Sequence, residues 1–259
     1  MSRKTVLITG CSSGIGKGTA EFFEKEGWKV ISTSRSGDNM MKLDVTNVED
    51  RRAICDYIEN ECDGRLDCLV NNAGYGLMGL IESLSDQQIR DCIETNVLGA
   101  VFLARDLIPA LRKAKGKVLN VSSLFGIIGY PLGTAYCMSK FALNGAMESL
   151  RYELSWNGVQ VGVIIPGAHK TRFSENMRLG KCTDSFLKFR QHLHESKTTA
   201  GPDVVAQTIY KLACKKRIPF KTYIRFQEKI IKYMGKFLPD RIFYWVLKKV
   251  SEKLTQDKL

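Results

Sequence analysis

The sequence predicts an α/β protein with one doubly wound parallel sheet and helices on both of its faces. Short apolar runs of strand length recur along the chain, and stretches of helical periodicity separate them. Strands that are apolar throughout and alternate with helices are typical of a parallel sheet covered on both sides. The 259 residues, 44% of them hydrophobic, contain no linker-like segment, which predicts a single domain over residues 1–259. The strand-like runs cover residues 6–8, 30–33, 66–70, 118–121 and 159–165.

The first strand leads directly into a glycine-rich turn and an amphipathic helix, which Gly27 ends. Such glycines let the backbone turn tightly and approach a pyrophosphate, while the N-terminus of the helix attracts its negative charge. The spacing is Gly-x-x-x-Gly-x-Gly rather than the more common Gly-x-Gly-x-x-Gly, and a glycine turn alone can also be a plain strand-to-helix connection. The turn predicts a dinucleotide site that includes Gly10, Ser12, Ser13, Gly14, Ile15 and Gly16.

The second strand ends beside a basic residue. In dinucleotide-binding α/β folds this point meets the adenosine ribose, where a carboxylate binds the 2′-hydroxyl and a basic side chain accommodates a 2′-phosphate. Here Arg35 follows the strand, while the nearest carboxylate, Asp38, comes later in a loop. Arg35 therefore favours NADP(H) over NAD. The alternative is that Arg35 is a solvated loop charge.

Tyr136 and Lys140 are four residues apart at the start of a predicted helix that continues through Leu150. This separation puts both side chains on one face of the helix. An ammonium beside a phenol favours the phenolate, so the pair predicts a group that exchanges protons near neutral pH, as the oxidation of an alcohol requires. By itself the Tyr-x-x-x-Lys pattern also occurs by chance in long chains.

Several motifs occur together and in one order: Thr9 to Gly16, Asn71-Asn72-Ala73-Gly74, Asn96, Ser123, Tyr136-x-x-x-Lys140 and Pro166-Gly167. In these motifs, over residues 4 to about 215, the chain resembles the short-chain dehydrogenase/reductase family, in which the serine precedes the tyrosine by thirteen residues, as it does here. The stretch from Gly74 to Glu82 resembles the branch that contains hydroxysteroid and retinol dehydrogenases. The resemblance implies a Rossmann-type fold and an oxidoreductase.

The resemblance also implies roles for the residues of the motifs. Tyr136 would be the general acid or base, Lys140 would lower its pKa and hold the cofactor ribose, and Ser123 would bond the substrate oxygen. Asn96 corresponds to a helix residue that anchors a water in a proton path from Lys140. An equally weighted interpretation makes Asn96 a polar residue that kinks a helix and is satisfied locally.

Further residues correspond to cofactor contacts of the family. Ser12 would add a hydroxyl at the phosphate site, Asp44 and Val45 would hold the adenine, and Thr171 would bind the nicotinamide carboxamide. In the same loop His169 departs from the aliphatic residue usual there, and we assign it no catalytic role. Asn72, Ala73 and Gly74 would flank the ribose, although Gly74 also fits a plain turn.

Residues 172–200 correspond to the variable substrate lid of the family. Here apolar side chains are interspersed with charge, which predicts a lipophilic ketone, aldehyde or secondary alcohol as substrate. The alternative, at even weight, is that these residues only pack the lid against the body. The apolar lid residues are Phe173, Met177, Leu179, Phe186, Leu187 and Phe189.

The positive charge of the chain is concentrated at its C-terminal end. Of a formal net charge of +12, residues 211–259 contribute +10, from 14 Lys and Arg against 4 Asp and Glu. Within residues 226–259 apolar and basic residues alternate at helical spacing on both sides of Pro239, which predicts two basic amphipathic helices. Such helices can lie on an anionic membrane surface. The favoured alternative is that they close the substrate cleft or a dimer interface.

Composition and motifs exclude several other classes. The first strand begins within four residues of Met1 and no apolar stretch is long enough to span a bilayer, so we expect a cytoplasmic protein, with peripheral membrane contact only through the tail. Eight cysteines without Cys-x-x-Cys indicate reduced thiols, and the three histidines do not form a metal site. No recognised motif for nucleic-acid binding accompanies the charge.

The leading hypothesis is therefore an NADP(H)-dependent oxidoreductase, with a dimer or tetramer expected by resemblance. The same enzyme with NAD is the nearest alternative. A second class is a cofactor-binding sensor or scaffold on the same fold, since a fold alone does not guarantee an activity. A third is a peripheral membrane protein whose tail carries its main function.

Overall fold

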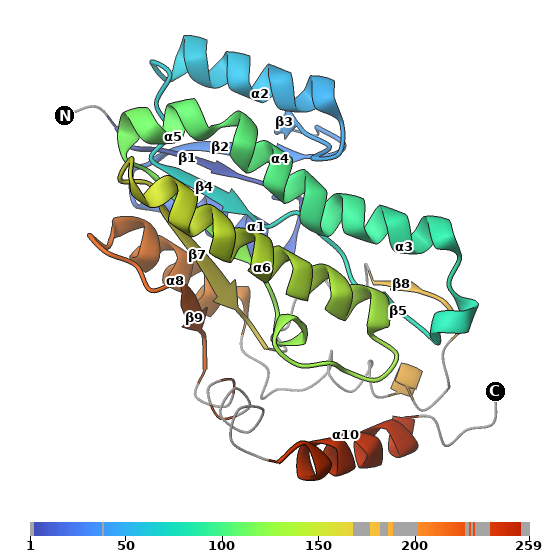
Figure 1. The fold of residues 1–259 in the computed structure, drawn as a ribbon. Coiled ribbons are helices and arrows are strands. Elements are labelled where there is room, and N and C mark those ends of the chain that lie inside the picture. Colours follow the sequence, from blue (N-terminus) through green and yellow to red (C-terminus); the bar gives the residue numbers. More distant parts are fainter. Residues whose placement is uncertain are drawn as a thin grey trace.

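The fold is built on a central sheet of seven strands in the order β3-β2-β1-β4-β6-β7-β9, and every neighbouring pair is parallel (Figure 1). The computed structural model describes residues 3–37, 39–167, 177–181, 186–188, 201–225, 228, 230 and 239–254. The strands of this sheet are β1 (Thr5–Ile8), β2 (Lys29–Ser34), β3 (Met41–Lys42), β4 (Cys68–Asn71), β6 (Lys117–Val121), β7 (Gln160–Ile165) and β9 (Lys221–Tyr223).

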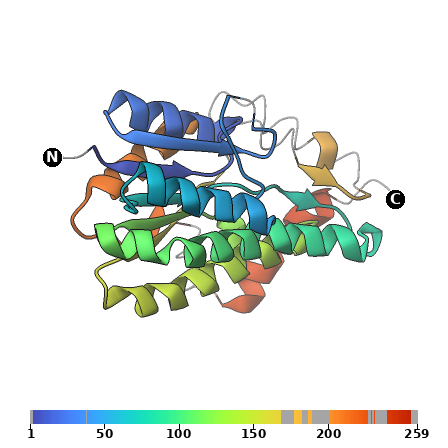
Figure 2. The same ribbon diagram turned by 90° about the horizontal axis from the view of Figure 1, so that it is seen from above.

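Helices cover both faces of the sheet (Figures 1 and 2). On one face α1 and α8 pack on a core that includes Phe23 and Ile209, and on the other face α2, α4, α5 and α6 pack on a core that includes Ile54, Leu103 and Met147. The helices are α1 (Gly14–Lys25), α2 (Val48–Glu61), α3 (Asp86–Ile93), α4 (Gly99–Asp106), α5 (Ile108–Ala114), α6 (Thr134–Ser155), α8 (Pro202–Cys214) and α10 (Asp240–Leu254).

This arrangement confirms the expected doubly wound α/β fold of Rossmann type. The strand order reverses between β1 and β4, and in open α/β sheets the ligand site lies beyond the carboxyl ends of the strands at such a point. The register places Ile8 of β1 opposite Val70 of β4, so the glycine turn after β1 and the asparagine loop after β4 leave the sheet side by side. The expected strand over residues 66–70 lies two residues further along, at Cys68–Asn71.

A small second sheet pairs β5 (Leu77–Met78) with β8 (Arg178–Leu179). Each strand has two residues, which is too short for periodicity to reveal, and the sequence did not predict them. Gly79 and Gly180 continue these strands in close contact, since a Cβ on Gly79 would lie 3.0 Å from the Gly180 Cα. This sheet attaches the described part of the lid to the segment that follows β4.

Between α3 and α4 the helix widens into a π-helical turn over Glu94–Leu98. A π turn inserts an extra residue into the helix and is often found at functional sites. Here it carries Asn96, whose side chain is 1% exposed.

One charged side chain is buried beside the sheet. Arg51 of α2 is 5% exposed, donates from Nε to Asp106 at 3.0 Å and from a terminal nitrogen to the Val45 carbonyl at 2.9 Å. Its guanidinium also stacks 5.3 Å from the ring centroid of Phe102. Arg51 thereby joins α2 and α4 to the loop that carries Val45.

We expect Arg51→Met to lower the free energy of unfolding by about 3 kcal/mol, because the buried Val45 carbonyl and Oδ2 of Asp106 both lose the Arg51 donor, while Oδ1 of Asp106 stays bonded to Arg105. Arg52→Met is the matched control: Arg52 is exposed and pairs with the exposed Glu49 one turn away, so its loss should cost less than about 0.5 kcal/mol. Urea unfolding of both variants at pH 7 measures the difference. Equal losses would show that the Arg51 contacts contribute little.

Candidate active site

The glycine turn between β1 and α1 has the conformation that its residues predict. Gly10 has φ +72°, a value that side chains disfavour, and a Cβ on Gly16 would lie 2.3 Å from the Gly10 carbonyl oxygen. Because α1 begins at Gly14, the N–H groups of its first turn, which have no partner within the helix, point toward the carboxyl edge of the sheet. Ser12 and Ser13 lie in the turn before α1, and Ile15 lies in the first turn of the helix. This geometry fits the pyrophosphate of a dinucleotide.

The loop after β4 is bonded to this turn. The Asn72 amide nitrogen donates to the carbonyls of Thr9 at 2.8 Å and Gly10 at 3.2 Å. In return the Thr9 hydroxyl accepts from the backbone N–H groups of Asn72 at 2.9 Å and Ala73 at 2.8 Å. Asn72 and Ala73 therefore fix the position of the turn. Thr9 is the first residue of the motif that ends at Gly16, but the sequence did not suggest a role for its side chain.

The residues expected at the adenosine end lie on neighbouring loops. Arg35 is exposed and directly follows β2. Asp44 accepts from the backbone N–H of Thr46 at 2.9 Å and from its hydroxyl at 2.7 Å, so its carboxylate shapes the turn before α2. Val45 is buried and contacts the position of Gly99, where a Cβ would lie 2.5 Å from Cγ2 of Val45.

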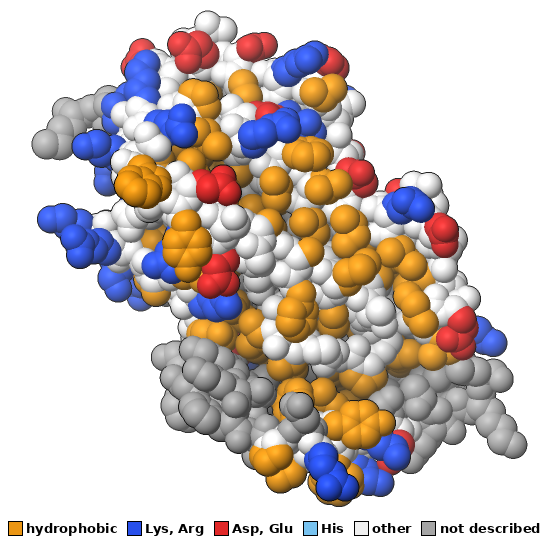
Figure 3. Space-filling view, in the orientation of Figure 1, with side chains coloured by type: hydrophobic (Ala, Val, Ile, Leu, Met, Phe, Trp, Pro, Cys, Tyr) orange, Lys and Arg blue, Asp and Glu red, His pale blue; other side chains and the backbone are white. Residues whose placement is uncertain are grey.

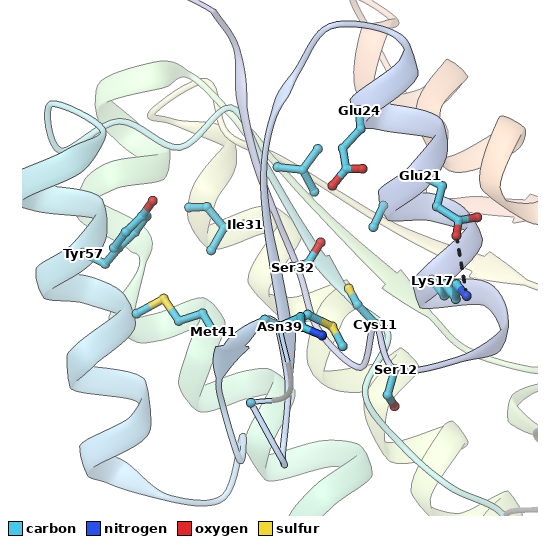
Figure 4. A pocket seen from close by; sticks show the side chains of 14 residues that line it. Cys11, Ser12, Lys17, Glu21, Glu24, Ile31, Ser32, Asn39, Met41 and Tyr57 are labelled. Carbon is cyan, nitrogen blue, oxygen red and sulfur yellow. Dashed lines mark ion pairs between the residues drawn. The ribbon is translucent and has the colours of Figure 1, made fainter.

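A groove of about 820 Å³ begins at Ser12 and extends between α1 and α2 along the edge of the sheet (Figure 4). Its walls include Tyr57 on α2 and, on α1, Lys17, Glu21 and Glu24; Lys17 and Glu21 form an ion pair of 3.8 Å. Ser123, Tyr136 and Lys140 do not line this groove. The groove therefore adjoins the adenosine end of the predicted cofactor site rather than the predicted catalytic residues.

Ser123 and Tyr136 are hydrogen-bonded to each other, and Lys140 lies beside them. Ser123 follows β6 and its oxygen accepts from the Phe125 N–H at 3.2 Å, which leaves the hydroxyl hydrogen for the phenol. Tyr136 is in the first turn of α6 and 5% exposed. Burial raises its pKa, and the bond from Ser123 acts in the opposite direction. From the sequence we expected Lys140 to lower the pKa of Tyr136. In the structure burial has the larger effect and raises this pKa.

Lys140 is also buried, at 5% exposure, one helical turn after Tyr136. Its Nζ donates to the Val121 carbonyl at the end of β6, at 3.0 Å, and lies 5.8 Å from the centroid of the tyrosine ring. Burial lowers the pKa of Lys140 from its ordinary 10.5 to about 8, while Cys92 acts to raise it. The buried environment thus disfavours the charged form of Lys140. An anionic or oxygen-rich ligand beside the ammonium would stabilise its charge.

Asn96 is satisfied by protein groups of the loop after β4 and of α6. Its oxygen accepts from the Tyr75 N–H at 3.0 Å, and its amide nitrogen donates to the Tyr75 carbonyl at 2.9 Å and to the Ser139 hydroxyl at 3.0 Å. A Cβ on Gly74 would lie 2.8 Å from the Asn96 oxygen and 3.8 Å from Lys140 Nζ. The contacts match the interpretation of Asn96 as a locally satisfied residue in an irregular helix, and its role in a proton path stays a prediction.

Apolar side chains surround the phenol. Tyr136 packs in one cluster with Met78, Leu132 and the lid residue Phe186, which is 3% exposed. The ring of Phe125 meets Tyr136 edge-on at 6.0 Å between centroids. Other lid residues at the edge of this cluster are Met177, Leu179 and Leu187, while Phe173 and Phe189 lie outside the described residues.

A residue that the sequence did not suggest supports the loop after β7. Glu228 is 3% exposed and accepts from the backbone N–H groups of Gly167 at 2.7 Å, Ile224 at 2.7 Å and Arg225 at 2.8 Å. It thereby ties the start of the loop expected to bind nicotinamide to the segment after β9. Thr171, His169 and Asp38 lie outside the described residues, so the structure does not test them.

The fold and the site together define a dinucleotide-binding oxidoreductase with a Ser-Tyr-Lys arrangement. A sequence profile described as short chain dehydrogenase matches residues 4–181. The chain belongs to the short-chain dehydrogenase family.

Curated relatives include the branch that the Gly74–Glu82 stretch indicated. A 3-ketodihydrosphingosine reductase of Bacteroides thetaiotaomicron is 32% identical, over 96% of this chain and 98% of its own. Human retinol dehydrogenase 16 is 32% identical, with 94% and 88% covered. Human 17-beta-hydroxysteroid dehydrogenase type 1 is 31% identical, with 92% and 80% covered. The resemblance to hydroxysteroid and retinol dehydrogenases is confirmed.

Solved structures agree over the whole length of the fold. A short-chain dehydrogenase from Streptomyces avermitilis has a TM-score of 0.81 and 28% identity, and the match covers 97% of this chain and 98% of that one. ElxO with NADP bound has a TM-score of 0.73 and 28% identity, with 86% of this chain and 97% of that one covered.

We expect Lys140→Met to abolish turnover yet raise stability at pH 7. Burying the ammonium costs about 3 kcal/mol, judged from the lowered pKa, and loss of the bond to Val121 offsets part of the gain, which leaves about 1–2 kcal/mol. Between pH 8 and 10.5 the unfolded wild-type chain binds more protons at this lysine than the folded one, so wild-type stability rises there and the advantage of the variant fades. Urea unfolding at pH 7 and pH 9.5 tests this, and a destabilised variant at pH 7 would contradict it.

Proposed function

We propose that this protein is an NADP(H)-dependent oxidoreductase that interconverts a lipophilic ketone or aldehyde and the corresponding alcohol. The observation that carries the proposal is the hydrogen bond between Ser123 and Tyr136, with Lys140 buried one turn away. These side chains meet at the carboxyl edge of the sheet, the edge at which the glycine turn also ends. The bound cofactor and the proton donor would therefore lie at the same edge of the sheet.

The chain would supply orientation and a proton, and the nicotinamide, when bound, supplies or accepts the hydride. Tyr136 would donate its proton to the substrate oxygen during reduction, and Ser123 would bond the same oxygen as it gains negative charge. The buried phenol carries its proton at neutral pH and can donate it when a carbonyl is reduced, and in the reverse reaction the phenolate would accept a proton from the alcohol. Lys140 would hold the ribose, and Asn96 would connect it to a proton path.

Arg35 and a structural relative support NADP(H). Arg35 stands exposed directly after β2, and the first carboxylate that follows it in the sequence, Asp38, comes three residues later. ElxO, a relative of this fold, holds NADP. Ser12, Asp44, Val45 and the loop of Asn72, Ala73 and Gly74 would contact the rest of the nucleotide, and Thr171 its carboxamide. An NAD-dependent enzyme of the same kind is the alternative.

We propose a lipophilic substrate because the side chains that pack around Tyr136 are apolar. Met78, Leu132, Phe125 and Phe186 surround the phenol with apolar surface. The curated relatives are named for a ketodihydrosphingosine, a retinol and a hydroxysteroid, which supports a bulky apolar alcohol or ketone. A screen of NADPH oxidation with acyl ketones, retinoids, steroids and small quinones would identify the class.

We also propose a homo-oligomer that assembles through the outer face of α6. Met138, Phe141 and Tyr152 are 44%, 45% and 62% exposed and recur at helical spacing on this face. Hydrophobic side chains gather over the same region in Figure 3. Such a patch is typical of an interface between subunits. The cytoplasmic location expected from the sequence stays a prediction.

We expect Tyr136→Phe to lower kcat by a factor of about 10² to 10⁴, because the proton donor is lost while the apolar ring remains. Binding of NADPH, followed by fluorescence titration, should stay within about threefold of wild type, since the ring still packs in its cluster. Tyr152→Phe, on the exposed face of the same helix, is the control and should leave both quantities unchanged. Turnover that survives Tyr136→Phe would refute the mechanism and favour a sensor or scaffold.

We expect Arg35→Asp to weaken NADPH about 10- to 100-fold, because a charge-assisted contact to the 2′-phosphate is replaced by repulsion. NADH lacks that phosphate, so its affinity should change by less than about threefold. Arg52→Asp reverses an exposed charge on α2 and serves as the control. Dissociation constants for both nucleotides decide the matter: an equal loss for NADPH and NADH would leave Arg35 without a role in cofactor choice.

A further inference from the structure

Helix α10 has two unlike faces. Phe243, Val246, Leu247 and Val250 are half-buried, whereas Ile242, Tyr244 and Trp245 on the other side are 48%, 67% and 59% exposed. The sequence predicted a basic amphipathic helix after Pro239 but not which of its apolar residues, among them Ile242 and Trp245, are exposed. The structure turns these two large side chains to solvent.

The exposed face of α10 is basic as well as apolar. Its cationic residues alternate with the exposed aromatic ones, and Glu252 pairs with Lys249 at 2.9 Å and with Lys248 at 3.9 Å. Figure 3 shows hydrophobic and basic side chains next to each other over this helix, at the bottom of the view. The cationic residues of the face are Arg241, Lys248, Lys249 and Lys253.

The position of α10 in the fold leaves this face open. Among the described helices and strands, none packs extensively against α10. The helix lies toward the end of the molecule at which the central strands end, the same end as the start of α6 with Tyr136 (Figures 1 and 2). A surface bound by α10 would therefore lie at the same end of the molecule as the start of α6.

We propose that α10 is an interfacial helix that lies flat on an anionic lipid bilayer. Trp245 and Ile242 would enter the boundary between headgroups and acyl chains, and the four cationic side chains would reach the lipid phosphates. Trp and Tyr are well suited to this boundary because their rings are apolar and their N–H or O–H groups are polar. Within the part of the chain that the structure describes, no helix has the length and apolarity needed to cross a bilayer.

Charge favours a lipid surface over a second copy of the chain. In a two-fold symmetric dimer the same patch meets itself, so Arg241, Lys248, Lys249 and Lys253 would face identical cations across the interface. An anionic bilayer is complementary to the whole patch, and to the net charge of +10 over residues 211–259. Nucleic acid would match the charge but would give Ile242 no apolar environment.

The test is co-sedimentation of the full-length protein with vesicles of phosphatidylcholine, alone or with about one third phosphatidylserine. We expect binding only to the anionic vesicles, and weaker binding at high salt. Lys248→Ala with Lys249→Ala should weaken it roughly thirty-fold, as two basic residues at an anionic surface predict. Trp245→Ser should weaken it by about tenfold or more. Trp156→Ser removes an exposed tryptophan at the end of α6, 90% exposed, and should leave binding unchanged.

Several results would overturn the proposal. These are no binding by the wild-type protein, equal binding to neutral vesicles, or equal effects of Trp245→Ser and Trp156→Ser. A change in oligomeric state of Trp245→Ser on size exclusion, with vesicle binding unchanged, would assign α10 to a subunit interface instead. Vesicle binding needs no substrate, and turnover of a water-soluble ketone by Trp245→Ser is measured separately, so failure here is distinct from failure of the proposed enzyme.

Discussion

The arrangement of the candidate active site depends on one buried cation, the ammonium of Lys140. Its bond to the Val121 carbonyl joins α6 to the end of β6, and Ser123 comes two residues after Val121. That bond therefore fixes the distance between the helix that carries Tyr136 and the strand end that carries Ser123. The same burial that holds these groups in place also costs stability at neutral pH, since it disfavours the charged form of Lys140 and lowers its pKa. Packing of the surrounding core therefore holds the Lys140 ammonium in an environment that disfavours its charge.

Asn96 extends this arrangement to a third element. Both backbone groups of Tyr75 and the hydroxyl of Ser139 bond to its amide, so the loop after β4, the π turn and α6 meet at one side chain. The Ser139 hydroxyl also donates to the Tyr136 carbonyl at 2.7 Å. The extra residue of the π turn explains how a long helix can bring an asparagine so close to the sheet edge. The π turn at Glu94–Leu98 therefore accounts both for the irregular helix and for the hydrogen bonds that satisfy the Asn96 side chain.

The sequence was sufficient for the sheet, its helices and the residues around Tyr136, because apolar strand runs and fixed motif spacings record local structure directly. It was insufficient where structure depends on contacts between distant segments. The two-residue strands β5 and β8 have no periodicity, and Glu228 is an isolated carboxylate in a basic segment. The pKa of Tyr136 was expected to fall because the argument counted the neighbouring charge but not burial, which only the packed structure reveals. In α10 periodicity found the amphipathic helix but did not determine which of its apolar residues face water.

The carboxylate of Glu228 has a consequence for how this protein can vary. It accepts from Gly167 at one end of the loop after β7 and from Ile224 and Arg225 just beyond β9. One carboxylate therefore anchors the start of the loop after β7 and the segment after β9 together. A chain that ended before Glu228 would leave the amides of Gly167, Ile224 and Arg225 without this acceptor, so the position of the loop after β7 depends on a residue sixty-one positions further along the sequence.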